Sequence, residues 1–398
     1  MITLLALGAL SSVAFADTST FTFTAPASSP TDTSPFYVGP SNGSLPHTKT
    51  VHGCVFDRFI QIWLENTDFA SASASSVYQK LSAQGITLTG YYAVTHPSEP
   101  NYIAAVGGDF WGLGSDDFET IPTNISTVVD LLELENISWG EYMENMPTDG
   151  YKGYNYTNSD GYTYYVRKHN PLIIYDAVSQ NPARAARIRN FNDFAYDVGN
   201  NTLPQWFFVT PNMKDDGHDT DVDYQSQWLD YWLVPLLQNP HFNSEKTLIL
   251  LTFDENETYN INNQVYSILL GSAIPDHLKG TTDDTFYTHY STITTIQNNW
   301  KLRNLGRQDC NKTVSNVFKF VAEQTGYQNN GLTNTSTLPL LNITGTIPGP
   351  LNPEYWVPYL APNTSCVGAG KGPTYVPPGT NMLLNANTAP APVNLTAS

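Results

Sequence analysis

Two apolar segments, each followed at once by an acidic or amide pair, constrain the fold of this 398-residue chain more than any other feature. Residues 59–64 precede Glu65-Asn66, and residues 247–253 precede Asp254-Glu255. Short runs that are apolar at nearly every position are typical of strands buried on both faces, which occur in parallel sheets covered by helices. The two runs therefore predict strands of one parallel sheet, with their polar ends at its carboxyl edge.

The rest of the chain alternates helical and strand patterns. The run at 59–64 is followed by a helical pattern and then by a second strand pattern. Expected helices are 76–84, 128–134, 224–237, 292–300 and 314–324, and expected strands are 87–92, 137–139, 206–210 and 265–270. This β-α-β order predicts an α/β fold, a three-layer α/β/α sandwich around a mostly parallel sheet.

The two ends of the chain differ from this central part in composition. Residues 1–16 are apolar and end in Ala-Phe-Ala, the pattern of a signal peptide. Residues 17–48 are rich in Thr, Ser and Pro and predict an extended arm. Residues 49–330 form the main domain, and the Pro- and Gly-rich residues 331–398 predict an irregular extension packed on it.

Glycosylation motifs agree with a secretory route. Eleven Asn-x-Ser/Thr sequons follow the signal-like segment, and we expect a secreted, extracellular or cell-wall-associated glycoprotein. Glycans are predicted at Asn42, Asn124, Asn136, Asn155, Asn200, Asn311, Asn334, Asn342 and Asn363. The sequon at Asn256 directly follows the Asp254-Glu255 pair, so we predict that it is unmodified or points away. Asn394 carries the eleventh sequon and is left open.

Charge and cysteine content limit the partners. The net charge of −18 disfavours nucleic acid and anionic lipid, and no segment after residue 16 is apolar enough to insert in a membrane. Of the three cysteines, Cys310 and Cys366 both lie in the C-terminal part, so this pairing is favoured, with Cys54 left over. The oligomeric state is open.

The polar pairs at the strand ends suggest a metal site. Glu65, Asn66, Asp254 and Glu255 supply an oxygen-rich set, which suits a hard divalent cation such as Ca²⁺, Mg²⁺ or Mn²⁺, with Zn²⁺ also open. Each pair taken alone would equally suit a solvated strand end or a helix cap.

Ser98 lies in a rigid turn. Pro97 and Pro100 flank it, and the helical pattern at 101–106 puts the serine at a helix N-terminus, where amide groups favour a phosphate. A metal ion could lower the pKa of this hydroxyl and make it a nucleophile. The alternative is an ordinary helix cap.

Three histidines lie in polar loops that follow or precede the predicted elements. His218 follows Asp215-Asp216, and the neighbouring acids would keep its imidazole cationic. His169 belongs to the dense basic cluster at 167–169, and His289 precedes a helix. A surface or structural role is the alternative for each of them.

Five motifs occur in order between residues 56 and 303. They are Leu-Glu-Asn-Thr, Pro-Ser-x-Pro-Asn-Tyr, Lys-His-Asn-Pro, Pro-Asn-x-x-Asp-Asp-x-His-Asp and Thr-Phe-Asp-Glu. Together they resemble the phosphoesterase family of secreted fungal acid phosphatases and bacterial phospholipases C, in the alkaline-phosphatase-like superfamily. The Ser-x-Pro-Asn element is also similar to the nucleophile turn of nucleotide pyrophosphatases, where Thr often takes the place of Ser98.

The resemblance implies a role for each candidate. It makes 49–330 the catalytic domain, Ser98 the nucleophile, Asn101 a donor to phosphate oxygens, and His218 a phosphate-contacting or leaving-group residue. The metal ligands implied are Glu65, Asn66, Asp254 and Glu255, and the substrate pocket would contain Asp216, His169 and His289.

The function implied is an acid phosphatase that hydrolyses small phosphomonoesters through a phosphoserine and releases phosphate. The main alternative is a phospholipase C that acts on phospholipid diesters, which the absence of a recognisable C-terminal lipid-facing module disfavours. A glycoprotein with a decayed site and a sugar-binding module are weaker alternatives.

Overall fold

The computed structural model describes residues 21–339 and 347–396, so the predicted signal peptide and Asn342 lie outside the described residues. Eight strands form the main sheet, in the order β11-β2-β10-β9-β1-β8-β4-β7. Their bounds are, in that order, Thr281–Asp283, Ile86–Leu88, Ser267–Leu270, Thr247–Phe253, Arg58–Leu64, Trp206–Thr210, Trp139–Met143 and Ile188–Asn190. Within this sheet β10 runs antiparallel to its neighbours and the other pairs are parallel, which confirms the mostly parallel α/β fold.

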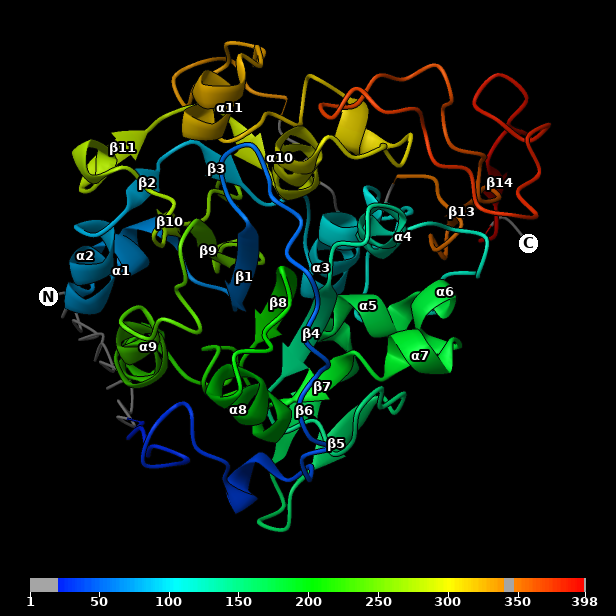
Figure 1. Cartoon of the computed structure of the whole chain (residues 1–398). Helices are drawn as coiled ribbons and strands as arrows, with labels where there is room; N and C mark the ends of the chain where they lie inside the picture. Colours follow the sequence, from blue (N-terminus) through cyan, green and yellow to red (C-terminus); the bar gives the residue numbers. More distant parts are fainter. Residues whose placement is uncertain (1–20, 340–346, 397–398) are drawn as a thin grey trace, which may run out of the picture.

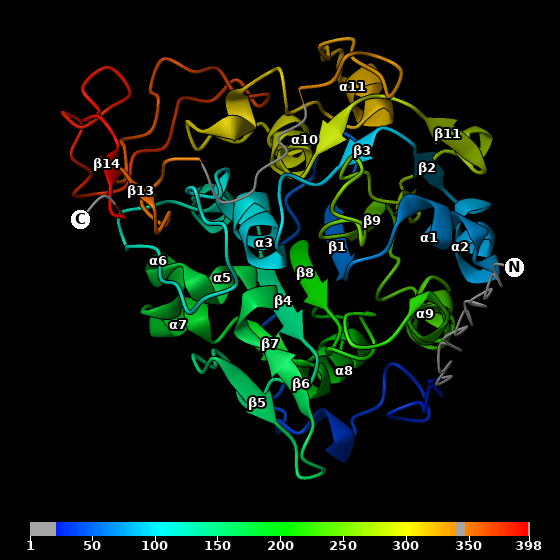
Figure 2. The ribbon, with the colours of Figure 1, turned by 180° about the vertical axis from the view of Figure 1, so that it is seen from behind.

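Helices lie on both faces of the sheet, as Figures 1 and 2 show. On one face α2 packs against α9, and on the other α3 packs against α4, α5 and α10. The α-helices are α1 Phe69–Ala74, α2 Ser76–Ser82, α3 Ser98–Gly107, α4 Val128–Leu134, α5 Pro171–Ile174, α6 Asp176–Ser179, α7 Pro182–Ala185, α8 Phe191–Gly199, α9 Val222–Leu236, α10 Tyr290–Trp300 and α11 Lys319–Thr325. Among the described residues, no helix has the length and apolar character needed to cross a bilayer.

Shorter elements complete the fold. Three two-stranded sheets pair β3 with β12, β5 with β6, and β13 with β14. Their bounds are β3 Tyr91–Tyr92, β12 Tyr287–Thr288, β5 Asn155–Thr157, β6 Thr163–Val166, β13 Tyr355–Trp356 and β14 Val393–Asn394. The 3₁₀ helices are η1 Pro35–Tyr37, η2 Arg167–His169, η3 Asp276–Leu278 and η4 Gln308–Cys310.

The register of β1 and β9 determines where the polar strand ends lie. Every residue of β9 is buried, as its apolar sequence predicts for a central strand covered on both faces. Leu64 pairs with Phe253 at the last position of both strands, and the amide of Asp254 donates to the Leu64 carbonyl at 3.1 Å. Glu65 and Asp254 therefore leave the sheet side by side at its carboxyl edge.

Two sequence predictions about elements are wrong. The strand expected at 87–92 is divided between β2 and β3, which belong to different sheets. The chain turns at Gly90, where a Cβ would lie 2.4 Å from the carbonyl oxygen of Thr285, so only glycine fits there. The helix expected at 314–324 begins only at Lys319, because the Asn316 side chain donates to the carbonyl of Phe286 and holds the preceding turn.

The N-terminal arm, described from residue 21 to residue 48, is anchored on α8. Its backbone amides at Ser34 and Asn42 donate to the side chains of Asn192 and Asp193, both at 2.7 Å. The C-terminal extension lies on the other side of the molecule, beyond α4 and α10 (Figure 1). Both segments are largely irregular but follow the surface of the α/β unit.

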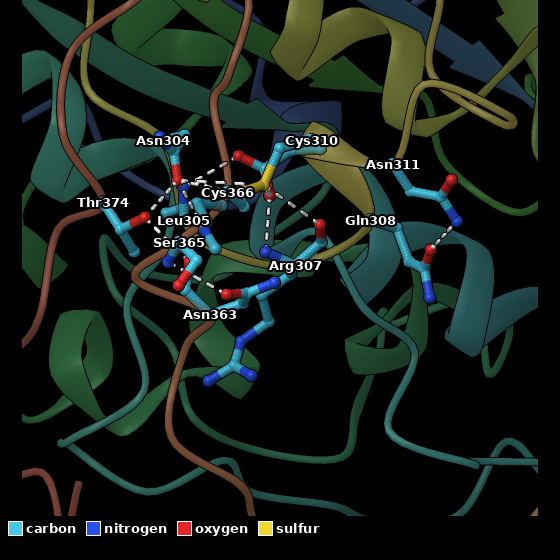
Figure 3. Close-up of a disulfide and its surroundings, with 12 residues drawn as sticks. Asn304, Leu305, Arg307, Gln308, Cys310, Asn311, Asn363, Ser365, Cys366 and Thr374 are labelled. Atoms are coloured by element: carbon cyan, nitrogen blue, oxygen red, sulfur yellow. Dashed lines mark hydrogen bonds between the residues drawn. A yellow bond between two sulfur atoms is a disulfide. The ribbon is translucent and has the colours of Figure 1, made fainter. Parts of the chain in front are cut away.

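A disulfide ties the C-terminal extension to the α/β unit. It joins Cys310, in η4, to Cys366, with 6.2 Å between the Cα atoms, and Figure 3 shows the polar groups around it. This is the pairing favoured from the sequence. Cys54 is a free, exposed thiol.

We predict that Cys310→Ser lowers the free energy of unfolding by about 2–4 kcal/mol, because the bond closes a long loop in the unfolded chain. Cys54→Ser is the matched control and should leave the unfolding midpoint unchanged. Denaturant unfolding of the two variants measures the difference, and equal midpoints would contradict the expectation.

Candidate active site

The carboxylate of Glu65, fully buried at the end of β1, is the centre of the candidate site. Its Oε1 accepts a hydrogen bond from the Tyr102 hydroxyl at 2.7 Å and lies 3.1 Å from His169 Nε2. Its Oε2 accepts from Ser98 Oγ at 3.2 Å and lies 2.9 Å from His218 Nδ1. Burial would raise the pKa of Glu65, but the facing His169 and His218 hold it well below its usual range. Glu65 is therefore ionised and contacts four side chains from three other segments of the chain.

Ser98 is the first residue of α3 and follows Pro97, the N-cap of this ten-residue helix. Its side chain is only 2% exposed, and its hydroxyl is directed at Glu65 across the carboxyl edge of the sheet. The sequence prediction of a serine at a helix N-terminus agrees with this position. A phosphoryl group on this oxygen would lie next to the free amides of the first helical turn.

Asn101 holds the turn that presents Ser98. Its Oδ1 accepts from the amides of Val94 and Thr95 at 2.9 and 3.1 Å. Its Nδ2 donates to the carbonyls of Thr95 and Pro97 at 2.9 and 3.2 Å. Both amide protons of the Asn101 side chain are thus bonded to backbone carbonyls. Neither is left to donate to a phosphate oxygen, which is the role that the family resemblance implied. In this structure Asn101 has the geometry of a positioning residue.

The second acidic pair lies beside Glu65. The Glu255 carboxylate accepts from Asn66 Nδ2 at 2.9 Å and lies 2.5 Å from His96 Nδ1. Burial and the charges of Glu65 and Glu255 raise the pKa of Asp254 well above its usual range, and burial also raises the pKa of Glu255. The four ligands predicted from the sequence are therefore brought together at one sheet edge.

The loop after β8 adds Asp216 and His218. Asp216 is buried, accepts from the His218 amide at 2.8 Å, and lies 3.3 Å from His169 Nδ1. Gly217 takes a φ of 98° between them, a conformation that side-chain-bearing residues rarely adopt. Burial lowers the pKa of His218, but its hydrogen bond to Glu65 outweighs this and raises the pKa above its ordinary value. The loop thus places a part-exposed imidazole on the same Glu65 oxygen that accepts from Ser98.

The remaining two histidine predictions have different outcomes. His169 is buried against Glu65, and burial lowers its pKa well below its ordinary value, although the charge of Glu65 opposes this shift. His289 lies behind the site, where Nε2 donates to the Asp254 carbonyl at 2.6 Å and Nδ1 lies 3.2 Å from the Tyr91 hydroxyl. Burial lowers the pKa of His289 to about 3. His289 therefore supports Asp254 from beneath, and both of its ring nitrogens are already bonded.

The donor set fits a divalent cation. Glu65, Asp216, Asp254 and Glu255 are four buried carboxyl groups in one cluster, which is costly without a compensating cation. Asn66 Oδ1 is buried and has no hydrogen-bond partner among the described residues. The oxygens of Glu65, Asn66, Asp254 and Glu255 suit a hard cation, whereas one atom each from Glu65, His169 and His218 lie within 4.8 Å of one another and suit a softer ion.

Three residues that the structure places at the site had no role assigned from the sequence. Tyr102 is one helical turn after Ser98, so the spacing of the motif could have placed it on the same face. His96 is next to Pro97 and contacts Glu255. Lys168 precedes His169 and forms an ion pair with Asp116 at 2.8 Å, a contact across 52 positions that no local pattern indicates.

Asn256, the sequon that follows the acidic pair, is fully buried. Its Nδ2 donates to Asp68 Oδ1 at 3.1 Å and to the Thr258 carbonyl at 2.7 Å. The atom that would carry a glycan is thus held inside the protein. By contrast, the sequons at Asn42, Asn136, Asn155, Asn200, Asn311, Asn363 and Asn394 are exposed.

We predict that Asn256 is unmodified in protein from a glycosylating host, because a glycan on Nδ2 would break both of its hydrogen bonds. Peptide mass spectrometry after enzymatic deglycosylation in ¹⁸O-water should label exposed sequons such as Asn42 and Asn363, but not Asn256. Stoichiometric labelling of Asn256 would contradict this geometry.

Comparisons with known proteins show the family of the chain. The model of the phosphoesterase family matches residues 51–303. An acid phosphatase of Aspergillus fumigatus is 52% identical over 303 residues, which are 76% of this chain and 66% of that protein. A phosphate-repressible acid phosphatase of Penicillium chrysogenum is 48% identical over 313 residues, 78% of this chain and 74% of that protein.

A solved structure is similar at a lower level. The phosphonate monoester hydrolase of Agrobacterium radiobacter has a TM-score of 0.43 and 11% identity, and the match covers 69% of this chain and 78% of that one. The family model covers more than half of the chain and the relatives are about 50% identical, so the family resemblance of the five motifs is confirmed. The chain therefore belongs to the phosphoesterase family and is a phosphoric-ester hydrolase.

Proposed function

We propose that this protein is a secreted acid phosphatase that hydrolyses phosphomonoesters through a phosphoserine on Ser98 and releases inorganic phosphate. The contact between Ser98 Oγ and Glu65 Oε2 at the N-terminus of α3 carries this proposal. The names of the two fungal relatives support acid phosphatase activity. Seven exposed sequons support passage through the secretory route.

Each residue of the site has its own role in the proposed reaction. Asn101 fixes the turn, and Glu65 orients the serine hydroxyl, so Ser98 Oγ can attack phosphorus in line. The bond from phosphorus to the ester oxygen breaks, and cationic His218 gives the leaving oxygen a proton. Ser98 Oγ and His218 Nδ1 share one oxygen, Glu65 Oε2, so the serine proton can replace the one that His218 gives up. Water then hydrolyses the phosphoserine and restores the free serine.

Glu65, Asn66, Asp254 and Glu255 would hold a divalent cation, with His169 as a further donor beside Glu65. A bound cation would lower the pKa of the serine hydroxyl and polarise the phosphoryl group. The buried acidic cluster repels an anionic substrate, so the phosphoryl group would depend on the bound cation and on the amide groups of α3 for attraction.

Ser98→Ala should lower kcat for p-nitrophenyl phosphate by roughly a thousandfold or more, because the nucleophilic oxygen is lost. Ser76→Ala is the matched control, since Ser76 is the exposed first residue of α2 just as Ser98 is the first residue of α3. A Ser98→Ala enzyme with wild-type turnover would exclude the nucleophile.

Removal of the metal should abolish hydrolysis, because the cation that polarises the phosphoryl group is lost. It should also lower the melting temperature without unfolding the sheet, whose register rests on the pairing of β1 with β9. The experiment combines metal analysis of purified enzyme, exhaustive chelation, and recovery of activity with Ca²⁺, Mg²⁺, Mn²⁺ or Zn²⁺. Full activity of verified metal-free enzyme would refute the metal assignment. A higher rate on phosphatidylcholine than on p-nitrophenyl phosphate would instead favour the phospholipase alternative.

A further inference from the structure

Lys168 is a cation inside an acidic site. The protein carries a net charge of −18, so an anionic substrate reaches the carboxylates only if a local positive group offsets them. The Lys168 side chain is 14% exposed and precedes His169, whose Nε2 contacts Glu65 at 3.1 Å. The Lys168 ammonium group forms an ion pair with Asp116 at 2.8 Å. Lys168 is therefore a positively charged side chain next to the acidic cluster.

Asp116 links Lys168 to the backbone amide that follows the reacting serine. Its Oδ2 lies 2.8 Å from Lys168 Nζ, and its Oδ1 accepts from the backbone amide of Glu99 at 2.9 Å. Glu99 directly follows Ser98, so this amide belongs to the first turn of α3. One carboxylate thus accepts a hydrogen bond from a helix N-terminal amide and forms an ion pair with an ammonium group. These are two kinds of donor that proteins use to bind phosphate.

The Asp116 carboxylate is also free to move away from its two donors. Its side chain is 28% exposed, and its backbone is held separately, because the carbonyl of Asp116 accepts from the Tyr154 hydroxyl at 3.1 Å. The side chain can therefore rotate into solvent while the loop stays in place. A phosphomonoester, which carries up to two negative charges, competes well with a single carboxylate for the same donors.

We propose that Lys168 is a catalytic residue that binds the phosphoryl group at Ser98, and that Asp116 occupies its donors until phosphate displaces it. This inference deepens the function proposed above and rests on it. Lys168 contributes charge that does not depend on the metal ion, and the amide of Glu99 contributes the second hydrogen bond. Asp116 acts as an internal competitor that keeps both donors in place between turnovers.

Substitution of the two partners should move phosphate affinity in opposite directions. Lys168→Met should raise the inhibition constant of inorganic phosphate against p-nitrophenyl phosphate by about tenfold or more, because a charge-assisted hydrogen bond is lost. Asp116→Asn keeps an acceptor for the Glu99 amide but removes the competing charge, so it should lower that constant by about threefold. Lys168→Arg, which keeps the charge, should restore part of the affinity.

Lys80 and Asp230 supply the matched control, an exposed Lys–Asp ion pair at 2.9 Å on the surface. Lys80→Met and Asp230→Asn should leave the inhibition constant unchanged. Calorimetric titration of inorganic phosphate into the Ser98→Ala enzyme, with and without Lys168→Met, measures the same affinity without turnover.

The outcomes separate the two proposals. If wild-type enzyme fails to hydrolyse phosphomonoesters, the proposed function fails. If the wild type is active but Lys168→Met binds phosphate as the wild type does, the inference about Lys168 is overturned. An ion pair that only stabilises the fold would lower the melting temperature in both Lys168→Met and Asp116→Asn and leave phosphate affinity unchanged, which also overturns it.

Discussion

Glu65 is a buried carboxylate whose two oxygens contact four side chains from different parts of the chain. Tyr102 and Ser98 come from α3, His169 from η2, and His218 from the loop after β8. An ionised group in this position is costly unless each of its lone pairs is used, so the four partners and Glu65 stabilise one another. The geometry of the serine, the loop and the imidazoles therefore depends on one charge.

That charge lies where it does because of strand pairing. Leu64 and Phe253 are partners at the ends of β1 and β9, so Glu65 and Asp254 cannot separate without a shift in register. A shift by one residue would turn every side chain of a fully buried strand to the other face, which the packing on both sides forbids. The apolar sequence of the two strands thus fixes the distance between the acidic pairs, and a cluster of like charges persists only because the sheet enforces it.

The sequence predicted the parts of the site that depend on local pattern. Strand ends and a serine between two prolines are local features, so the acidic pairs and Ser98 were identified. Other contacts of the site join residues that are far apart in the sequence, such as Lys168 and Asp116. The periodicity of the sequence does not predict such contacts. Asn101 was identified as a site residue, but its role depended on whether its amide faced the turn or the substrate. Only the folded loop decides that.

The reacting atoms lie deeper than the groups around them. Ser98 is 2% exposed, whereas His218 and Lys168 reach the surface. On the proposed mechanism, the phosphoryl group has to reach a buried serine, whereas the alcohol portion of the ester stays near side chains that are open to water. Recognition would then rest on the charge and shape of one end of the substrate, and such an enzyme would discriminate weakly among alcohols.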